Sequence, residues 1–255
     1  MSHVSGSLRT LLANLIDYAG LYPPAALPLP EVAENYRRYR ESPDSWMLNR
    51  LVLPLAKLES LQLAADWRIA LLVDDEPGHL PRQVETLEIK SARKLSLPTY
   101  CEVPLRQVIG GFAKVRTGGL TPDAIPSAAE IADFLCSAAR RRVPFKATAG
   151  LHHPLRSTQP LTYAGDSPRD IMHGFINVFV AAAFAWQSAD RAQVLEILTD
   201  CEAASFEFDD RALGWRGQKL PTIAIAAARR DFAHCFGSCS FEEPVAVLRK
   251  LGWLD

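Results

Sequence analysis

The chain of 255 residues is 48% hydrophobic and 22% charged, and its formal net charge is −1 at pH 7. This length and apolar content suit one barrel-sized α/β domain with a sizeable buried core. The balanced charge gives no long-range field to recruit nucleic acid or an anionic membrane, and no apolar run approaches the roughly 20 residues of a membrane span, so we expect neither as a partner.

Short apolar runs alternate with helical patterns along most of the chain. The predicted strands are 14–21, 49–55, 67–75, 98–105, 111–119, 144–150, 204–210 and 234–241. The predicted helices are 30–40, 56–65, 80–95, 126–142, 168–202, 221–233 and 242–252. Little room is left for a helix after the fourth strand. Ser127, three residues before Glu130, has the spacing of a helix capping box.

Eight short strands that mostly alternate with helices predict a parallel sheet with right-handed crossovers. Eight such units in about 250 residues match the size of a (β/α)8 barrel. We therefore expect residues 1–255 to form a single barrel domain with an extra N-terminal helix. A doubly wound parallel sheet is the alternative.

Charged side chains lie near the ends of three neighbouring predicted strands. Because side chains alternate along a strand, Lys114 shares a face with Arg116, and Lys146 with Thr148. If these faces point inward, the barrel mouth holds these residues together with Glu102, at the end where barrel active sites lie. Simple pairing of Lys114 with Glu102 in a charged layer is the plainer alternative. Two lysines and an arginine on adjacent strands favour a functional cluster.

Lys146 is the candidate catalytic amine of this cluster. Phe145 and Ala147 should face the helices, which leaves Lys146 facing inward. The cations of Lys114 and Arg116 would lower the pKa of Lys146, so that a neutral amine attacks a carbonyl or acts as a base. Replacing Lys146 with methionine should then abolish turnover and leave the fold intact or more stable.

The segment PFKATAG, residues 144–150, resembles the sixth-strand segment of class I, Schiff-base aldolases of the deoxyribose-phosphate type. The resemblance implies a (β/α)8 barrel that needs no cofactor. It also implies that Lys146 is the Schiff-base lysine, Thr148 the neighbouring hydroxyl residue and Gly150 the glycine that follows.

The segment departs from that family in two respects. Ala147 and Ala149 replace its threonines. The second lysine of the family lies on the following strand, and the predicted strand 204–210 contains none. Lys114, on the preceding strand, stands as a substitute.

Several further residues are candidates for proton transfer or substrate binding. His152 or Glu102 would move protons at the mouth. Arg116 suits a carboxylate or a phosphate, as does the loop that contains Gly118 and Gly119. The other candidates for substrate binding are His153, Asp17 and Ser238, with helix capping or loop packing as the structural alternative for each.

A divalent metal such as Mg²⁺ or Zn²⁺ is the alternative to chemistry without a cofactor. Its ligands would be His152 or His153 together with His173 and one of Asp17, Asp74 and Asp209. No metal-binding motif supports this set. Cys235 and Cys239 are four residues apart without a second pair, and we assign them structural roles.

The cysteines and the N-terminal segment indicate a cytoplasmic protein. The five cysteines are an odd number without a dense framework, as expected of reduced thiols. Residues 1–20 make a poor signal peptide, because Asp17 interrupts the apolar stretch. The segment 173–187 is apolar nearly all round, which indicates a helix covered within the chain or a subunit contact, and we expect a homodimer.

These observations favour a lyase or aldolase that acts on a small anionic carbonyl compound through a lysine amine. An enzyme that enolises a similar substrate with a divalent metal is one alternative. A barrel that only binds a metabolite is another, because a fold alone does not define chemistry.

Overall fold

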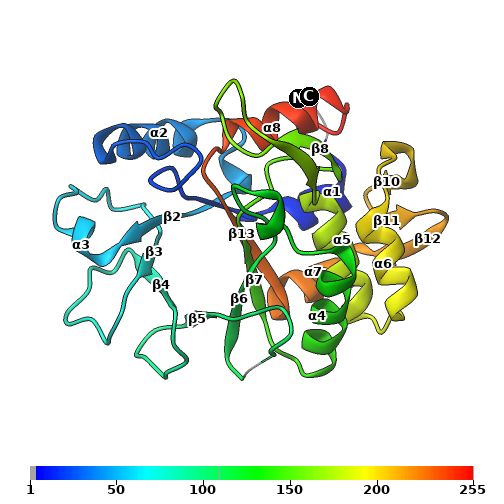
Figure 1. Ribbon diagram of the computed structural model, residues 1–255, viewed down its shortest axis with the longest axis horizontal. Helices are drawn as coiled ribbons and strands as arrows, with labels where there is room; N and C mark the ends of the chain where they lie inside the picture. The colour runs from blue at the N-terminus through cyan, green and yellow to red at the C-terminus, as the bar shows by residue number, and fades with distance from the viewer. Residues whose placement is uncertain (1–3, 109, 255) are drawn as a thin grey trace.

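The computed structural model describes residues 4–108 and 110–254, in which eight parallel strands close into a barrel (Figure 1). In chain order the barrel strands are β1 (Ile16–Tyr18), β2 (Leu48–Pro54), β3 (Ile69–Leu72), β4 (Val84–Ile89), β5 (Thr99–Glu102), β6 (Phe112–Arg116), β7 (Phe145–Thr148) and β13 (Ala233–Ser238). Each strand pairs with the next, and β13 closes the ring on β1. The predicted (β/α)8 barrel is confirmed, and the doubly wound alternative is wrong.

The fourth barrel strand lies where the sequence indicated a helix. β4 falls inside the predicted helix 80–95, and the predicted strand 204–210 lies outside the barrel. Leu87 and Ile89 are buried on the outer face of β4, while the inward-pointing Glu88 is also buried. A strand buried on both faces lacks a clean apolar–polar alternation, so its pattern is easily mistaken for that of a helix. Consequently β5, β6 and β7 are the fifth, sixth and seventh barrel strands.

Two small antiparallel sheets lie between β7 and β13 in the chain. β8 (Ser157–Pro160) pairs with β9 (Arg169–Met172). β10 (Phe206–Phe208), β11 (Ala212–Trp215) and β12 (Gln218–Pro221) form a three-stranded sheet. The predicted strand 204–210 is part of this second sheet, and it ends in an exposed turn rather than at the barrel mouth.

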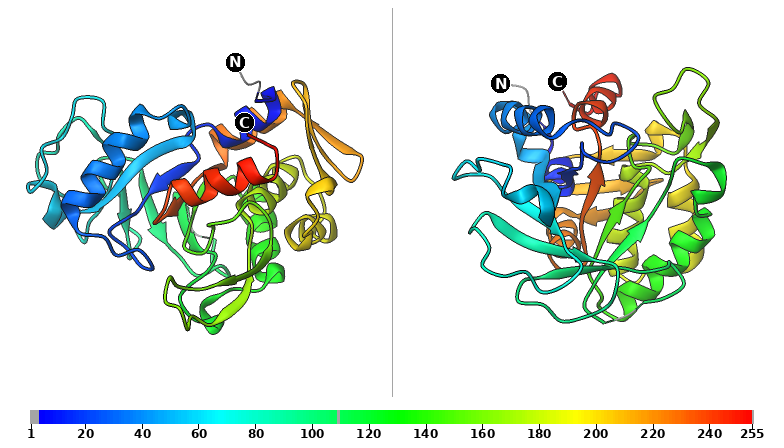
Figure 2. Two further views of the ribbon diagram at one scale, coloured as in Figure 1. Left: turned by 90° about the horizontal axis from the view of Figure 1, so that it is seen from above. Right: turned by 60° about the vertical axis from the view of Figure 1, so that its left-hand side comes forward.

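Helices cover only part of the barrel. They are α1 (Gly6–Leu12), α2 (Leu29–Glu41), α3 (Leu55–Leu58), α4 (Ala128–Arg140), α5 (Phe175–Trp186), α6 (Arg191–Thr199), α7 (Thr222–Asp231) and α8 (Glu242–Lys250). Short 3-10 turns span Ser45–Met47, Pro122–Ala124 and Ala203–Ser205. Figures 1 and 2 show α4, α5, α6 and α7 grouped on one side, whereas loops replace helices between β3 and β6. Leu80, Leu95 and Leu105 of these loops pack on the core instead.

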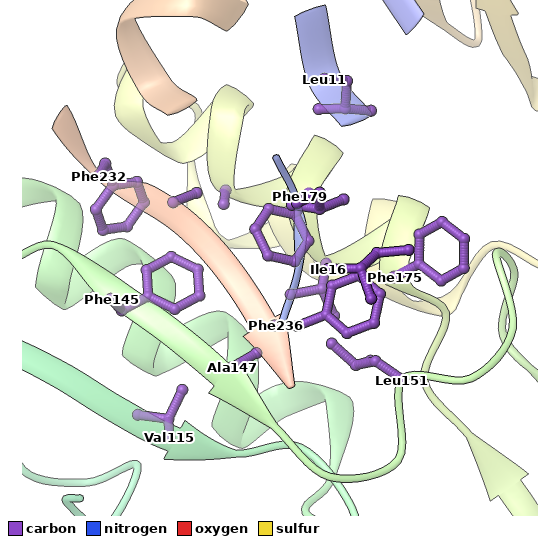
Figure 3. Close-up of a cluster of buried hydrophobic side chains, with 14 of the residues drawn as sticks. Leu11, Ile16, Val115, Phe145, Ala147, Leu151, Phe175, Phe179, Phe232 and Phe236 are labelled. Atoms are coloured by element: carbon purple, nitrogen blue, oxygen red, sulfur yellow. The ribbon is translucent and has the colours of Figure 1, made fainter. Parts of the chain in front are cut away.

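The apolar helix α5 is covered within the chain. Every residue from Phe175 to Ala185 is buried, and α5 contacts α4, α6 and α7 as well as β13. Phe145 of β7 stacks on Phe179 of α5 with ring centroids 6.2 Å apart, and Figure 3 shows Ala147 on the same side of β7. The chain itself therefore explains the apolar pattern, and the homodimer stays a prediction that this helix no longer supports.

The start of α4 is fixed by local hydrogen bonds. The Ser127 hydroxyl accepts a hydrogen bond from the Glu130 backbone N–H, and the Glu130 carboxylate accepts one from the Ser127 backbone N–H. The predicted capping box is confirmed. No helix in residues 4–108 and 110–254 has the length and apolar character needed to cross a bilayer.

Candidate active site

A network of two lysines and three carboxylates joins β1, β4, β5, β6 and β7 inside the barrel. Lys146 Nζ on β7 lies 2.5 Å from Asp17 Oδ2 and 2.5 Å from Glu88 Oε1. Lys114 Nζ on β6 lies 2.9 Å from Glu88 Oε2 and 3.3 Å from Glu102 Oε2. Glu88 therefore binds both ammonium groups at once. Such a network is tolerated in a barrel interior because each buried charge has an opposite partner.

The network runs from the barrel interior to solvent. Lys146 is 1% exposed, Lys114 is 8% exposed and the side chain of Arg116 is 61% exposed. Arg116 Nε lies 2.9 Å from Glu102 Oε1, so Glu102 connects Arg116 to Lys114. Of the three cations, Lys146 is thus the deepest and Arg116 lies at the rim.

Asp17 anchors the inner end of the network. Its Oδ1 accepts hydrogen bonds from Asn49 Nδ2 at 2.7 Å and from the Arg50 backbone N–H at 3.1 Å. Its Oδ2 accepts from Cys235 Sγ at 3.2 Å and from Lys146. Burial alone would raise the pKa of Asp17, but the cations of Lys146 and Arg50 outweigh it, and the pKa is lowered. Asp17 therefore remains ionised beside Lys146.

The predicted neutral state of Lys146 is wrong for this arrangement. Burial acts to lower the pKa of Lys146, but Asp17 and Glu88 outweigh it and raise that pKa well above its ordinary value. The alternation of side chains along the predicted strands identified the neighbouring cations Lys114 and Arg116. It missed Glu88, because Glu88 lies on the strand that was mistaken for a helix. Lys146 is consequently an ammonium ion held between two carboxylates.

This network predicts how stability depends on pH. The pKa values of Asp17 and Glu88 are lowered in the folded protein, so their stabilisation is present above about pH 4 and is lost as pH falls through the folded pKa values. The pKa of Lys146 is raised, so its contribution is present below about pH 10 and is lost only as pH rises through the folded pKa. We expect urea unfolding midpoints to stay high from about pH 5 to 10 and to fall steeply below about pH 4.

A cavity of about 480 Å³ opens above the network. Predicted site residues that line it are Glu102, Lys114, Arg116, Gly119, Lys146, Thr148 and His152. Lys114, Arg116 and Lys146 share this one cavity, as the alternation of their strands predicted. Tyr22, Leu120, Leu161 and Met172 add apolar wall to the same cavity. Its size and mixture of charged and apolar walls suit a small charged metabolite.

Four predicted substrate-binding residues do not line this cavity. Asp17 lies beneath Lys146 and is its ion partner. Ser238 is buried, and its hydroxyl donates to the Ser240 carbonyl at 2.6 Å in a turn. His153 lies in a smaller neighbouring cavity, with Nε2 3.7 Å from Glu243 Oε1. The fourth residue, Gly118 in the loop after β6, packs against the backbone of another loop.

Gly118 makes that contact with Gly150 of the loop after β7. A Cβ on Gly118 would lie 2.7 Å from the Gly150 Cα, and a Cβ on Gly150 would lie 2.8 Å from the Gly118 Cα. Gly150 also has a φ of 81°, a conformation that favours glycine. Two loops of the cavity mouth can approach this closely only because neither residue has a side chain.

The change Gly118→Ala tests this contact. The added methyl group must displace backbone, which should lower the free energy of unfolding by about 1–3 kcal/mol. Gly78→Ala is the matched control, because a Cβ there meets no atom within 4 Å. Urea denaturation of both variants measures the difference. Equal unfolding midpoints for the two would show that the loops separate without cost.

His152 forms a second polar cluster on the cavity wall. Its Nδ1 lies 2.9 Å from Glu243 Oε2 on α8, and its Nε2 lies 3.9 Å from Cys239 Sγ. Burial would lower the pKa of His152, but Cys239 and Glu243 outweigh it and raise that pKa to about 9. His152 is therefore largely protonated at neutral pH and is suited to donate a proton.

Glu88 and Cys239 are the main site residues that the sequence analysis missed. Glu88 was assigned to a helix, although the β-branched Val84, Thr86 and Ile89 around it are a signal for a strand. Cys239 had been given only a structural role. It follows the last barrel strand, the position from which barrels present functional side chains.

The residues considered for a divalent metal are not brought together. In the described part of the chain, no three or more His, Cys, Asp or Glu side chains form a group suited to hold a metal ion. His173 Nε2 lies 2.7 Å from the Pro126 carbonyl oxygen, and Asp74 and Asp209 are exposed.

The fold and the site define an α/β barrel with a charged cavity at the carboxyl ends of its strands. No protein-family profile, curated protein or solved structure matches the chain.

Proposed function

We propose that this protein is a cofactor-independent lyase of the aldolase type that acts on a small anionic carbonyl compound through a lysine amine. The observation that supports it most is the pair of lysines that share Glu88 at the floor of the cavity. Adjacent lysines with carboxylates can supply an amine nucleophile, a proton acceptor and a fixed positive charge in one place.

Lys114 is the amine that we assign to the substrate. Its contacts with Glu88 and Glu102 are longer than the two 2.5 Å contacts of Lys146, and it is less deeply buried. To attack a carbonyl, Lys114 must lose a proton, and either carboxylate is close enough to accept it. Lys146 stays charged between Asp17 and Glu88 and supplies the fixed positive charge beside Lys114.

The corrected strand order agrees with these roles. Lys114 lies on β6, the sixth barrel strand, and Lys146 lies on β7, the seventh. The aldolase family that the segment 144–150 resembles has its Schiff-base lysine on the sixth strand and its second lysine on the next. The segment that carries the resemblance contains Lys146, so our assignment of the covalent role to Lys114 depends on its contacts and exposure and not on the resemblance.

Arg116 and His152 supply the remaining functions. Arg116 at the rim can bind a carboxylate or phosphate of the substrate, since its side chain is largely exposed beside Glu102 and a guanidinium matches the geometry of these groups. His152 lines the same cavity and, when protonated, can donate to an oxyanion or a carbanion. Thr148, on the cavity wall two residues after Lys146 in sequence, can position the adduct.

The free thiols support a reducing location. All five cysteines are free, and four of them are buried. We therefore propose that the protein works in the cytoplasm, where thiols remain reduced.

Borohydride trapping tests the proposed function. The protein is mixed with a panel of sugar phosphates and 2-oxo acids, reduced with sodium borohydride and weighed by intact-mass spectrometry. A mass gain equal to one reduced substrate adduct is expected for at least one compound. No adduct with any compound, together with turnover that requires an added divalent metal, would favour the metal-dependent enolising alternative.

A further inference from the structure

Cys239, His152 and Glu243 form a chain of interacting groups on the wall of the cavity. His152 Nε2 faces Cys239 Sγ at 3.9 Å, and His152 Nδ1 lies 2.9 Å from Glu243 Oε2. The imidazole thus contacts a thiol with one nitrogen and a carboxylate with the other. This order of nucleophile, base and orienting acid is the one that activates a cysteine for attack.

The surroundings of Cys239 favour its thiolate. Burial raises the pKa of Cys239, but His152, the Tyr163 hydroxyl at 3.7 Å and the Ala25 backbone N–H together outweigh it, and that pKa is lowered. The single Tyr163 hydroxyl proton can be donated either to Cys239 Sγ or to Glu243 Oε2, which lies 3.1 Å away. These groups come from three parts of the chain, around residue 25, residues 152–163 and residues 239–243.

The thiol opens onto the same cavity as the lysine network. Cys239 is 5% exposed, yet it lines the cavity of about 480 Å³ together with His152, Lys114 and Arg116. None of the lysine network's ion pairs involves Cys239 or His152. A ligand in this cavity therefore meets two separate nucleophilic groups, one on β6 and one after β13.

We propose that Cys239, activated by His152 and oriented by Glu243, is a second covalent site that takes a small anionic aldehyde as a reversible thiohemiacetal. The aldehyde is assigned because a thiolate beside an imidazolium needs an electrophilic carbon whose oxygen can accept a proton. The anionic group is assigned because Lys114 and Arg116 line the same cavity.

The addition balances without a co-reactant. The Cys239 sulfur forms a bond to the carbonyl carbon while the carbon–oxygen π bond breaks, and its electron pair passes to oxygen. The proton on His152 Nε2 then moves to that oxygen, which leaves a neutral imidazole and a hydroxyl group. Reversal returns the proton to His152 and the electron pair to sulfur, so the site binds the aldehyde without consuming it.

Alkylation with iodoacetamide, read cysteine by cysteine by peptide mass spectrometry, tests the activated thiol. At pH 6.5 Cys239 should react at least about tenfold faster than the exposed Cys201, although Cys239 is far less accessible. His152→Gln should remove this advantage, and Glu243→Gln should reduce it. Equal rates at Cys239 and Cys201, or a Cys239 rate that His152→Gln leaves unchanged, would overturn the proposal.

Protection of Cys239 tests the ligand class. Glyceraldehyde 3-phosphate should slow the alkylation of Cys239, and the original alkylation rate should return after the aldehyde is removed by dialysis. Glycerol 3-phosphate, which has no carbonyl group, should not slow the alkylation. Both compounds are tested on the Lys114→Met variant as well as on the wild-type protein. A Schiff base at Lys114 is then not mistaken for protection at Cys239. Equal protection by the aldehyde and the alcohol would contradict covalent addition. A protected Cys239 without any borohydride adduct would leave this inference standing and refute the lysine mechanism.

Discussion

Replacing Lys146 with methionine is expected to lower the free energy of unfolding by about 3–5 kcal/mol, because it leaves two buried carboxylates without their shared cation. Asp17 and Glu88 are 1% and 3% exposed, and each lies 2.5 Å from Lys146 Nζ. The sequence alone indicated the opposite, a fold unharmed or stabilised by loss of a buried cation. That expectation did not include the ion pairs of Lys146 with Asp17 and Glu88.

Urea denaturation at pH 7 measures this effect, with two control variants. Lys57→Met is the matched surface change, because Lys57 is exposed on α3, and it should shift the midpoint little. Glu88 keeps its ion pair with Lys114 in Lys146→Met, so the double variant Asp17→Asn with Lys146→Met removes the carboxylate that depends most on Lys146 and should recover part of the loss. A Lys146→Met midpoint equal to that of Lys57→Met would mean that the two carboxylates take up protons or water at no cost.

Replacing Lys114 with methionine has the largest expected effect on catalysis. Turnover of the substrate should fall by at least about a thousandfold, since the covalent amine is removed. Lys114→Arg should be equally inactive, because it keeps the charge beside Glu88 and Glu102 and loses the nucleophile. Both variants should remain folded, as Glu88 keeps Lys146 and Glu102 keeps Arg116.

Steady-state kinetics with circular dichroism as a check of folding provide the measurement. Arg116→Met is the comparison variant, and it should act mainly by raising KM, because Arg116 lies at the exposed rim and pairs with Glu102 at the outer end of the network. Near-normal turnover in Lys114→Arg would show that position 114 contributes only charge. The covalent role would then return to Lys146.

The fold was predictable because its signal is repeated along the chain. Alternation of apolar runs and helical patterns predicted a closed barrel, and strand parity predicted that Lys114, Arg116 and Lys146 share one cavity. These inferences need only the local period of each segment and a general rule about parallel strands.

The partners of these residues depend on pairing that the sequence does not reveal. Residues 84–89 read as part of a helix because β4 is buried on both faces and includes charged side chains. The resulting shift in strand number also moved Lys146 from the sixth position to the seventh. His152 and Cys239 meet across 87 residues of chain, and no local pattern relates them.

The central claim is that Lys114 forms the covalent bond to the substrate, and peptide mapping of the borohydride-reduced adduct tests it most directly. Protein trapped with a carbonyl compound that gives an intact-mass adduct is digested and sequenced by tandem mass spectrometry. We expect the added mass on Lys114, no adduct in Lys114→Met, and an adduct still present in Arg116→Met at higher substrate concentration. An adduct located on Lys146, or one that persists in full in Lys114→Met, would contradict it.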